Sequence, residues 1–169
     1  AAKTLIHSFV ANRVDYCNSL LARAPAYQKD ELQRVLNAAA RLVLKLNRSV
    51  HELRPLVRDR LHWLRVPERI DYKLCLFVYK ALHGLAPQYL AEMSKPVGAV
   101  EYRGHLRQAT RWKLLVPRHK LETYGPRAFS IAGPTVWNDL PDSLRDPNLN
   151  LGLFRSQLKT HFFNRSYDL

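Results

Sequence analysis

One run of apolar residues constrains the fold of this chain more than any other feature of the sequence. Between residues 30 and 47, apolar side chains recur at intervals of one, three or four, at Leu32, Val35, Leu36, Ala39, Leu42, Val43 and Leu46. This spacing places them on one face of an α-helix, and the alanines at 38–40 add high helix propensity. Because such a helix is stable mainly when its apolar face is covered, residues 30–47 predict a core built from several helices.

Other segments carry helical signals of the same kind. We expect helices over residues 3–22, from about Ser49–Glu52, over 67–84, from Pro87 to about Met93, and over about 150–164. Ser49 and Glu52 have the spacing of a capping box, Pro67 suits a first helical turn, and Gly84 suits a helix end. Gly125-Pro126 and Gly133-Pro134 are expected to punctuate two short helical pieces that carry Phe129, Ile131, Val136 and Trp137, and the one convincing strand candidate is 112–116.

The predicted fold class is mainly α. Residues 1–93 are expected to form a helical bundle, and residues 94–169 a basic loop and strand segment followed by a C-terminal helical extension, with at most one or two short strands. Cys17 and Cys75 both fall on apolar helix faces and are expected to be buried, reduced thiols. The longest apolar run, 74–79, is far shorter than the roughly 20 residues that span a bilayer, so we predict no membrane partner.

The charge of the chain indicates a polyanionic partner. Lys and Arg number 27 against 14 Asp and Glu, which gives a net charge of +13. Such an excess attracts polyanions, of which nucleic acid is the usual one. The excess is +5 in residues 1–50, +3 in 51–100, +5 in 101–127 and zero in 128–169. We therefore expect a polyanion to meet residues 30–50 and 101–127 rather than the last helix.

Two basic patches are the candidate nucleic-acid-binding sites. The first lies on the 30–47 helix, where spacings of seven, four and three place four cations on one face: Arg34, Arg41, Lys45 and Arg48. A solvated charged face is the alternative interpretation. The second combines six cations with an aromatic residue: Arg103, Arg107, Arg111, Trp112, Lys113, Arg118 and Lys120. Trp112 is either a stacking platform for a base or a core anchor.

The sequence carries no recognisable catalytic or metal-binding motif. It has no adjacent pair of aspartates, no Cys-x-x-Cys, no His-Glu-x-x-His, no Gly-x-Ser-x-Gly and no Gly-rich phosphate loop. Asp139, Asp142 and Asp146 lie in a Pro-rich loop and are interpreted as helix caps. We predict no catalytic residue, metal site, cofactor or small-molecule substrate.

A series of short strings, taken in order, resembles one family. They are RVDYCNSLL (13–21), LQRVLNAAARLV (32–43), LHWL (61–64), IDYK (70–73), KALHGLAP (80–87), VPR (116–118), YGPRAFS (124–130), WNDLP (137–141) and FRSQLKT (154–160). This series is similar to the C-terminal region of reverse transcriptases from non-LTR retrotransposons, the long interspersed elements of the jockey and chicken-repeat kind.

The resemblance implies a function without catalysis. The first helices would correspond to the polymerase thumb, which grips a template–primer duplex, and the catalytic aspartates and an endonuclease would lie upstream. We therefore expect a non-catalytic fragment of an RNA-directed DNA polymerase, located in the nucleus or cytoplasm. Its partners would be an RNA–DNA hybrid or duplex, bound without base specificity, and the rest of the polymerase. The alternatives are a helical protein–protein interaction module and an inert remnant of a decayed element.

Overall fold

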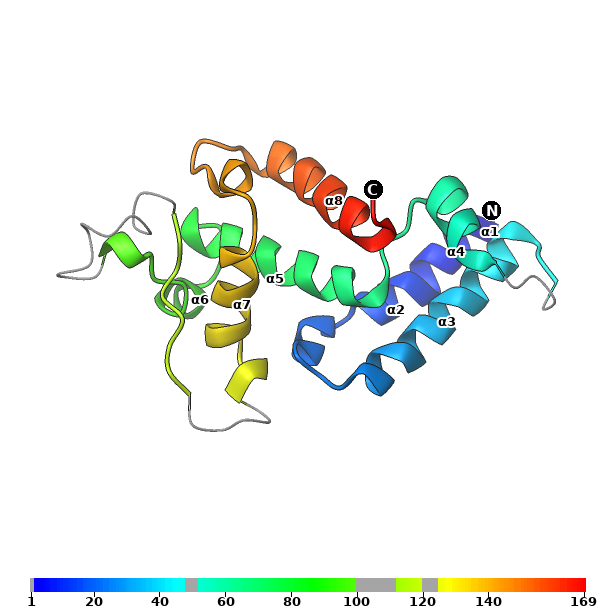
Figure 1. Cartoon of the computed structure of the whole chain (residues 1–169), viewed down its shortest axis with the longest axis horizontal. Coiled ribbons are helices and arrows are strands. Elements are labelled where there is room, and N and C mark those ends of the chain that lie inside the picture. The colour runs from blue at the N-terminus through cyan, green and yellow to red at the C-terminus, as the bar shows by residue number, and fades with distance from the viewer. Residues whose placement is uncertain (1, 48–51, 100–111, 120–124) are drawn as a thin grey trace.

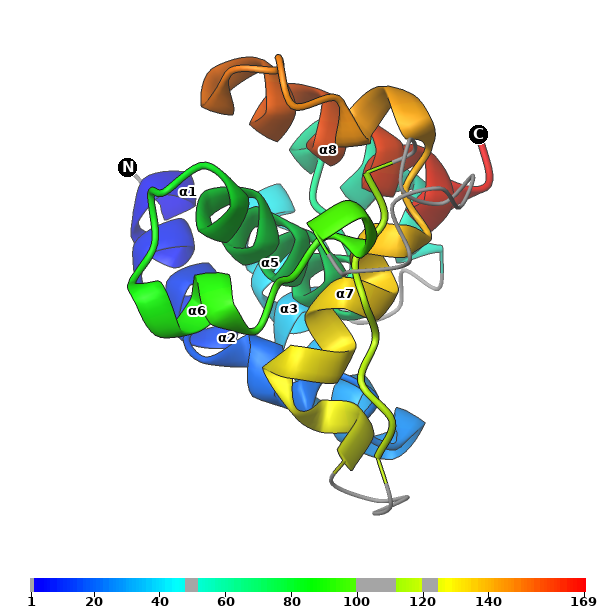
Figure 2. The same ribbon diagram turned by 90° about the vertical axis from the view of Figure 1, so that its left-hand side faces the viewer.

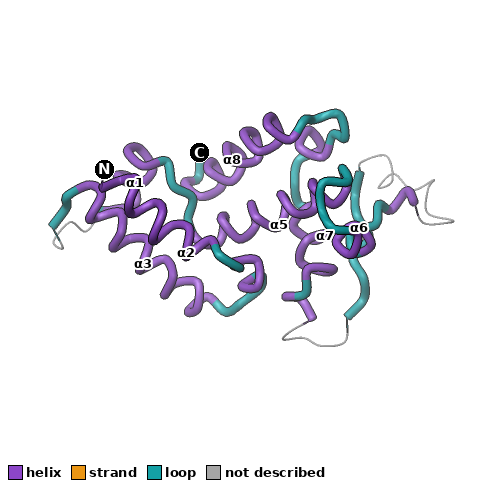
Figure 3. Tube along the Cα trace, turned by 180° about the vertical axis from the view of Figure 1, so that it is seen from behind, coloured by secondary structure: helices purple, strands orange, loops and turns teal. Residues whose placement is uncertain are grey.

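The computed structural model describes residues 2–47, 52–99, 112–119 and 125–169. Helices account for the regular structure in these residues, which confirms the predicted mainly α fold class. Figure 3 shows helices joined by loops, with no strand in the described residues. Figure 1 places the N-terminal helices at one end of a central helix, α5 (Val66–Leu82), the helices between residues 88 and 138 at its other end, and the last helix alongside it.

The N-terminal segment is broken into several helical pieces. They are α1 (Ala2–Ile6), a π-helical segment η1 (His7–Ala11), α2 (Asn12–Asp15) and a 3-10 turn η2 (Asn18–Leu21). The prediction of one helix over 3–22 is therefore wrong, because Cys17 takes a left-handed conformation, with a φ of +51°, and turns the chain. This turn leaves Cys17 exposed, which corrects its predicted burial, and buries Asn18 instead.

The segment that most constrains the fold forms α3 (Ala26–Leu44), which packs against α1, η1 and α5. Leu36, Ala39 and Ala40 are buried, but Val35 and Leu42 are exposed, so the apolar stripe is only partly covered. The stripe is wider than the contact that one layer of neighbouring helices makes with α3. The chain continues through α4 (Leu53–Leu56) and η3 (Val57–Leu61), and the predicted capping box beginning at Ser49 lies outside the described residues.

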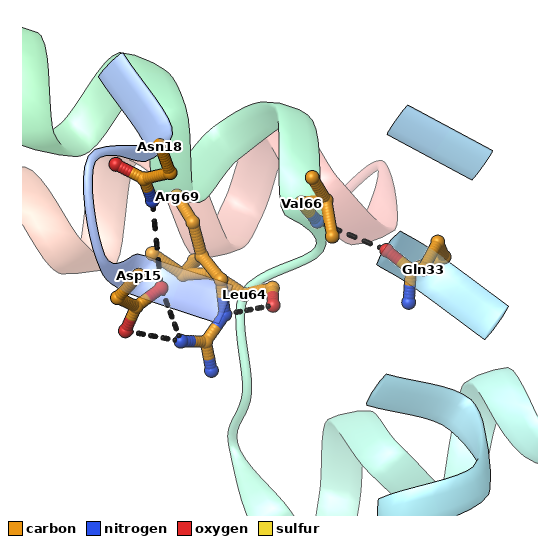
Figure 4. Close-up of polar contacts among 6 residues, drawn as sticks. All are labelled: Asp15, Asn18, Gln33, Leu64, Val66 and Arg69. Carbon is orange, nitrogen blue, oxygen red and sulfur yellow. Dashed lines mark hydrogen bonds and ion pairs between the residues drawn. The ribbon is translucent and has the colours of Figure 1, made fainter. Parts of the chain in front are cut away.

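The central helix is α5 (Val66–Leu82), as the sequence predicts. Pro67 lies in its first turn, and Gly84 follows its end with a φ of +67°. The side chain of Gln33 on α3 accepts a hydrogen bond from the backbone N–H of Val66 at 2.9 Å (Figure 4). This bond satisfies a donor that the helix cannot satisfy itself and anchors α5 to α3. The short predicted helix after Pro87 is α6 (Gln88–Glu92).

Two predictions for the later segments need correction. The predicted break at Gly133-Pro134 is absent, because Phe129, Ile131, Val136 and Trp137 lie on one helix, α7 (Phe129–Asn138), which follows a 3-10 turn, η5 (Gly125–Arg127). Pro134 costs that helix one backbone hydrogen bond without ending it, because α7 packs extensively against α5. The predicted strand over 112–116 is reduced to an isolated bridge between Pro96 and Leu114. The Asn138 side chain hydrogen-bonds both the N–H and the carbonyl of Leu114 at 2.8 Å, and so takes the place of a neighbouring strand.

Two further 3-10 turns connect the later helices: η4 (Val97–Ala99) follows α6, and η6 (Asp142–Arg145) lies between α7 and the last helix, α8 (Leu151–Tyr167). Asn150 caps α8 by accepting a hydrogen bond from the N–H of Leu153 at 2.9 Å. Phe154, Leu158 and Phe162 are fully buried, and α8 packs against α5 (Figures 1 and 2).

One hydrophobic cluster joins the early and late parts of the chain. It includes Leu36 of α3, Leu74 of α5, Trp137 of α7 and Phe154 of α8. The predicted domain boundary at residue 93 stays a prediction, but core residues from both sides of it pack together. Across the described part of the chain, every helix is too short or too polar to traverse a bilayer.

Candidate nucleic-acid interface

The first predicted basic patch lies on the outer side of α3. Arg34 and Lys45 are exposed and Arg41 is half-buried, on the side of the helix opposite Leu36 and Ala40. Arg41 and Lys45 lie at the C-terminal end of α3, where positive charge is stabilised by the helix dipole. Lys45 itself takes a left-handed conformation, with a φ of +54°, as the helix ends. Arg48, the fourth predicted member, lies outside the described residues.

The second predicted patch is described only in part. Trp112 and Arg118 are exposed and Lys113 is half-buried, whereas Arg103, Arg107, Arg111 and Lys120 lie outside the described residues. Trp112 is 49% exposed, and its backbone carbonyl accepts a hydrogen bond from the indole Nε1–H of Trp137 at 3.1 Å. Trp137, at 2% exposure, is the core tryptophan of this region, which leaves the Trp112 ring available to solvent.

The structure does not bring the two patches together. In Figure 1, α3 and the extended segment 112–119 lie on opposite sides of α7. A single rod-like polyanion would therefore contact them as two separate surfaces.

Sequence reasoning missed a third cationic surface, a cleft between α2, α5 and α8. Its volume is about 330 Å³, and its basic residues come from α5 and α8: Arg69, Lys73, Arg155 and Lys159. The available signal was the pair of i, i+4 spacings, which places each pair on one helix face. Net charge counted by segment conceals this signal, because the four basic residues of 128–169 are balanced by four acidic ones.

The buried thiol of Cys75 and the aspartates before α8 are placed in structural rather than reactive environments. Burial raises the pKa of the Cys75 thiol well above its ordinary value, which keeps it protonated and unreactive. In the loop before α8, Asp142 forms an ion pair with Arg145, and Asp146 accepts hydrogen bonds from the backbone and side chain of Asn148. Within the described residues, no three His, Cys, Asp or Glu side chains are grouped so that they could hold a metal ion.

Comparison with protein-family models, with curated proteins and with solved structures found no match for this chain.

Proposed function

We propose that this chain is a non-catalytic nucleic-acid-binding fragment of a retrotransposon RNA-directed DNA polymerase. It would hold a template–primer duplex through backbone phosphates, in the nucleus or the cytoplasm, together with the rest of the polymerase. The observation that carries the proposal is the basic row of α3, in which Arg34 and Lys45 are exposed and Arg41 is half-buried, in a chain with a net charge of +13. The resemblance of the ordered strings supports the family, and the helical fold is compatible with it.

The mechanism of binding is electrostatic and independent of base sequence. Lysine and arginine side chains that neutralise phosphates release condensed counterions, so affinity falls as salt rises. Phosphate contacts fix position and orientation but carry little sequence information. Neutralising about six phosphates gives a slope of roughly −5 for log K against log salt concentration.

The test is fluorescence anisotropy of the full chain with a labelled RNA–DNA hybrid over a series of salt concentrations. The Arg34→Gln/Lys45→Gln variant removes two phosphate contacts, so the slope should become shallower by about two. A matched control, Arg60→Gln/Lys95→Gln, removes the same charge from η3 and the loop after α6 and should leave the slope closer to wild type. A wild-type slope near zero, or equal changes in the two variants, contradicts the proposal.

A helical protein–protein interaction module is the second candidate function. It is favoured by exposed apolar side chains on the N-terminal helices and α3, among them Phe9 at 67% exposure and Leu42 at 68%. Large exposed apolar patches are typical of interaction sites. Light scattering of the isolated chain tests this candidate, because concentration-dependent self-association supports it and a monomer at all concentrations counts against it.

A further inference from the structure

The cleft between α2, α5 and α8 contains an ion pair in which Arg69 neutralises the carboxylate of Asp15. Asp15 accepts hydrogen bonds from Nη1 of Arg69 at both carboxylate oxygens, at 2.9 and 2.7 Å. Nε of Arg69 donates to the carbonyl of Leu64 at 2.9 Å, which fixes the guanidinium in place (Figure 4). Among the described residues, Asp15 is the only acidic one that lines the cleft. Its charge is therefore cancelled, and any further cation in the cleft lacks a counter-charge there.

Three further cations line the cleft beside the Asp15–Arg69 ion pair. Lys73 lies four residues after Arg69 on α5, and Arg155 and Lys159 are four residues apart on α8. Because α5 and α8 pack against each other, the two pairs face one cavity. None of these three cations has an ion-pair partner within the described residues, although the ammonium of Lys73 lies 5.4 Å from the ring centre of Phe77. Three unbalanced positive charges in one cleft favour an anionic ligand.

Aromatic groups and an unpaired acceptor extend the recognition beyond charge. Half-buried Tyr72, exposed His62 and buried Trp63 also line the cleft, and the His62 ring stacks on that of Phe163 with centroids 5.9 Å apart. Asn18 lines it as well and is 3% exposed; its Nδ2 faces Asp15, which leaves the buried Oδ1 without a partner in the described residues. Figure 4 shows the Asn18 oxygen on the side of the amide away from Asp15. A cationic groove with stacking rings is the usual site for one strand of nucleic acid.

We propose that this cleft binds the phosphate group of a nucleotide, with Lys73, Arg155 and Lys159 neutralising it and the rings of Tyr72 and His62 contacting the adjoining nucleoside. Its volume of about 330 Å³ lies at the small end of ligand pockets, so it accepts one nucleotide unit rather than a duplex. The nucleotide can be free or part of a single strand, since both present the same phosphate. This site contains no residue of α3, and it goes beyond the duplex binding proposed above.

The test is NMR titration of the ¹⁵N-labelled full chain with four probes: 5′-AMP, a five-residue oligothymidylate, adenosine and inorganic phosphate. AMP or the oligothymidylate should shift the backbone amide signals of Asn18, Tyr72 and Lys73, adenosine should not, and inorganic phosphate should act more weakly. Tighter binding of the oligothymidylate than of AMP identifies a strand as the source, and the reverse identifies a free nucleotide. Absence of shifts at the cleft with both phosphate-bearing probes overturns the proposal.

Two triple variants distinguish binding at the cleft from non-specific attraction by the net charge of the chain. Lys73→Gln/Arg155→Gln/Lys159→Gln should weaken binding of the better probe by about tenfold or more, because it removes the charge-assisted hydrogen bonds. Arg60→Gln/Lys80→Gln/Lys95→Gln lowers the net charge equally at positions outside the cleft and should weaken it much less. Equal losses in the two variants overturn the proposal. The Arg34→Gln/Lys45→Gln variant should keep the cleft signals, so failure of duplex binding at α3 and failure here are distinguishable.

Discussion

Replacing Phe154 tests whether the two halves of the chain share one core. Its side chain is fully buried, and its ring stacks on Tyr79 of α5 with centroids 4.2 Å apart and an interplanar angle of 17°. The ring of Trp137 on α7 lies 5.9 Å away. Phe154→Ala removes the whole ring and should cost about 3–5 kcal/mol in the free energy of unfolding. For a chain of 169 residues, that loss lowers Tm by about 8–14 °C.

Two further substitutions separate the contributions to this loss of stability. Phe154→Leu keeps most of the buried volume but loses the ring stacking, and should cost about 1 kcal/mol, or about 3 °C in Tm. Leu153→Ala, at a neighbouring position that is 45% exposed, is the control and should change stability by less than about 0.5 kcal/mol.

The assay is thermal unfolding followed in parallel by far-UV circular dichroism and tryptophan fluorescence. Trp63 lies before the predicted boundary at residue 93 and Trp137 after it, and both are buried, so fluorescence reports on both halves. We expect one transition in wild type, and in Phe154→Ala one transition shifted to lower temperature for both probes. Two separate transitions in wild type, or a shift in Phe154→Ala no larger than that of Leu153→Ala, would refute the shared core.

Three further predictions follow from local contacts. Gly133→Ala should lower Tm by a few degrees in the same assay, because a Cβ on Gly133 would lie 3.1 Å from Cγ2 of Val78, where α7 meets α5; an unchanged Tm would show that the two helices separate at no cost. A thiol reagent should label exposed Cys17 in the native chain and buried Cys75 only after unfolding, as mass spectrometry can count; rapid labelling of both thiols contradicts this burial. Burial, with a contribution from neighbouring Arg165, lowers the pKa of His161 below its ordinary value of 6.5, so the unfolded chain binds its proton more readily. Stability should therefore fall as pH is lowered through about 6.5, and denaturant unfolding of His161→Gln should lack this component; an identical pH profile in the variant contradicts it.

The elements that were predictable from sequence are those whose periodicity and end signals agree. Residues 67–84 combine an apolar face, an early proline and a closing glycine, and they form α5 almost as expected. The break at Cys17 was not predictable, because a left-handed residue is usually signalled by glycine or asparagine and this one is not. At Pro134 the sequence predicts a helix break that the structure does not have, because packing of α7 on α5 outweighs one missing backbone hydrogen bond.

The candidate sites were predictable only where their residues are close in sequence. The basic row on α3 follows from the spacing within one helix, and the exposure of Arg34 and Lys45 agrees with it. The cleft joins Lys73 to Arg155 and Lys159 through the packing of α5 on α8, which no local pattern encodes. The exposure of Leu42 likewise depends on which helices pack against α3, and the spacing of apolar residues along α3 does not predict this packing.

The basic row on α3 and the cationic cleft hold their charges in different geometries, and the geometry limits what each can bind. From Arg34 to Lys45 the charges are spread along about 16 Å of helix axis, at 1.5 Å per residue. That length matches roughly five phosphates of one strand, at 3.4 Å of duplex axis each, so a line of this kind suits a polymer. In the cleft, Lys73, Arg155 and Lys159 converge on a single cavity, where the carboxylate of Asp15 is already paired with Arg69. Converging charges concentrate their potential at one place, which favours a single phosphate over an extended backbone. A chain that uses both surfaces would hold a duplex along α3 and one unpaired nucleotide in the cleft.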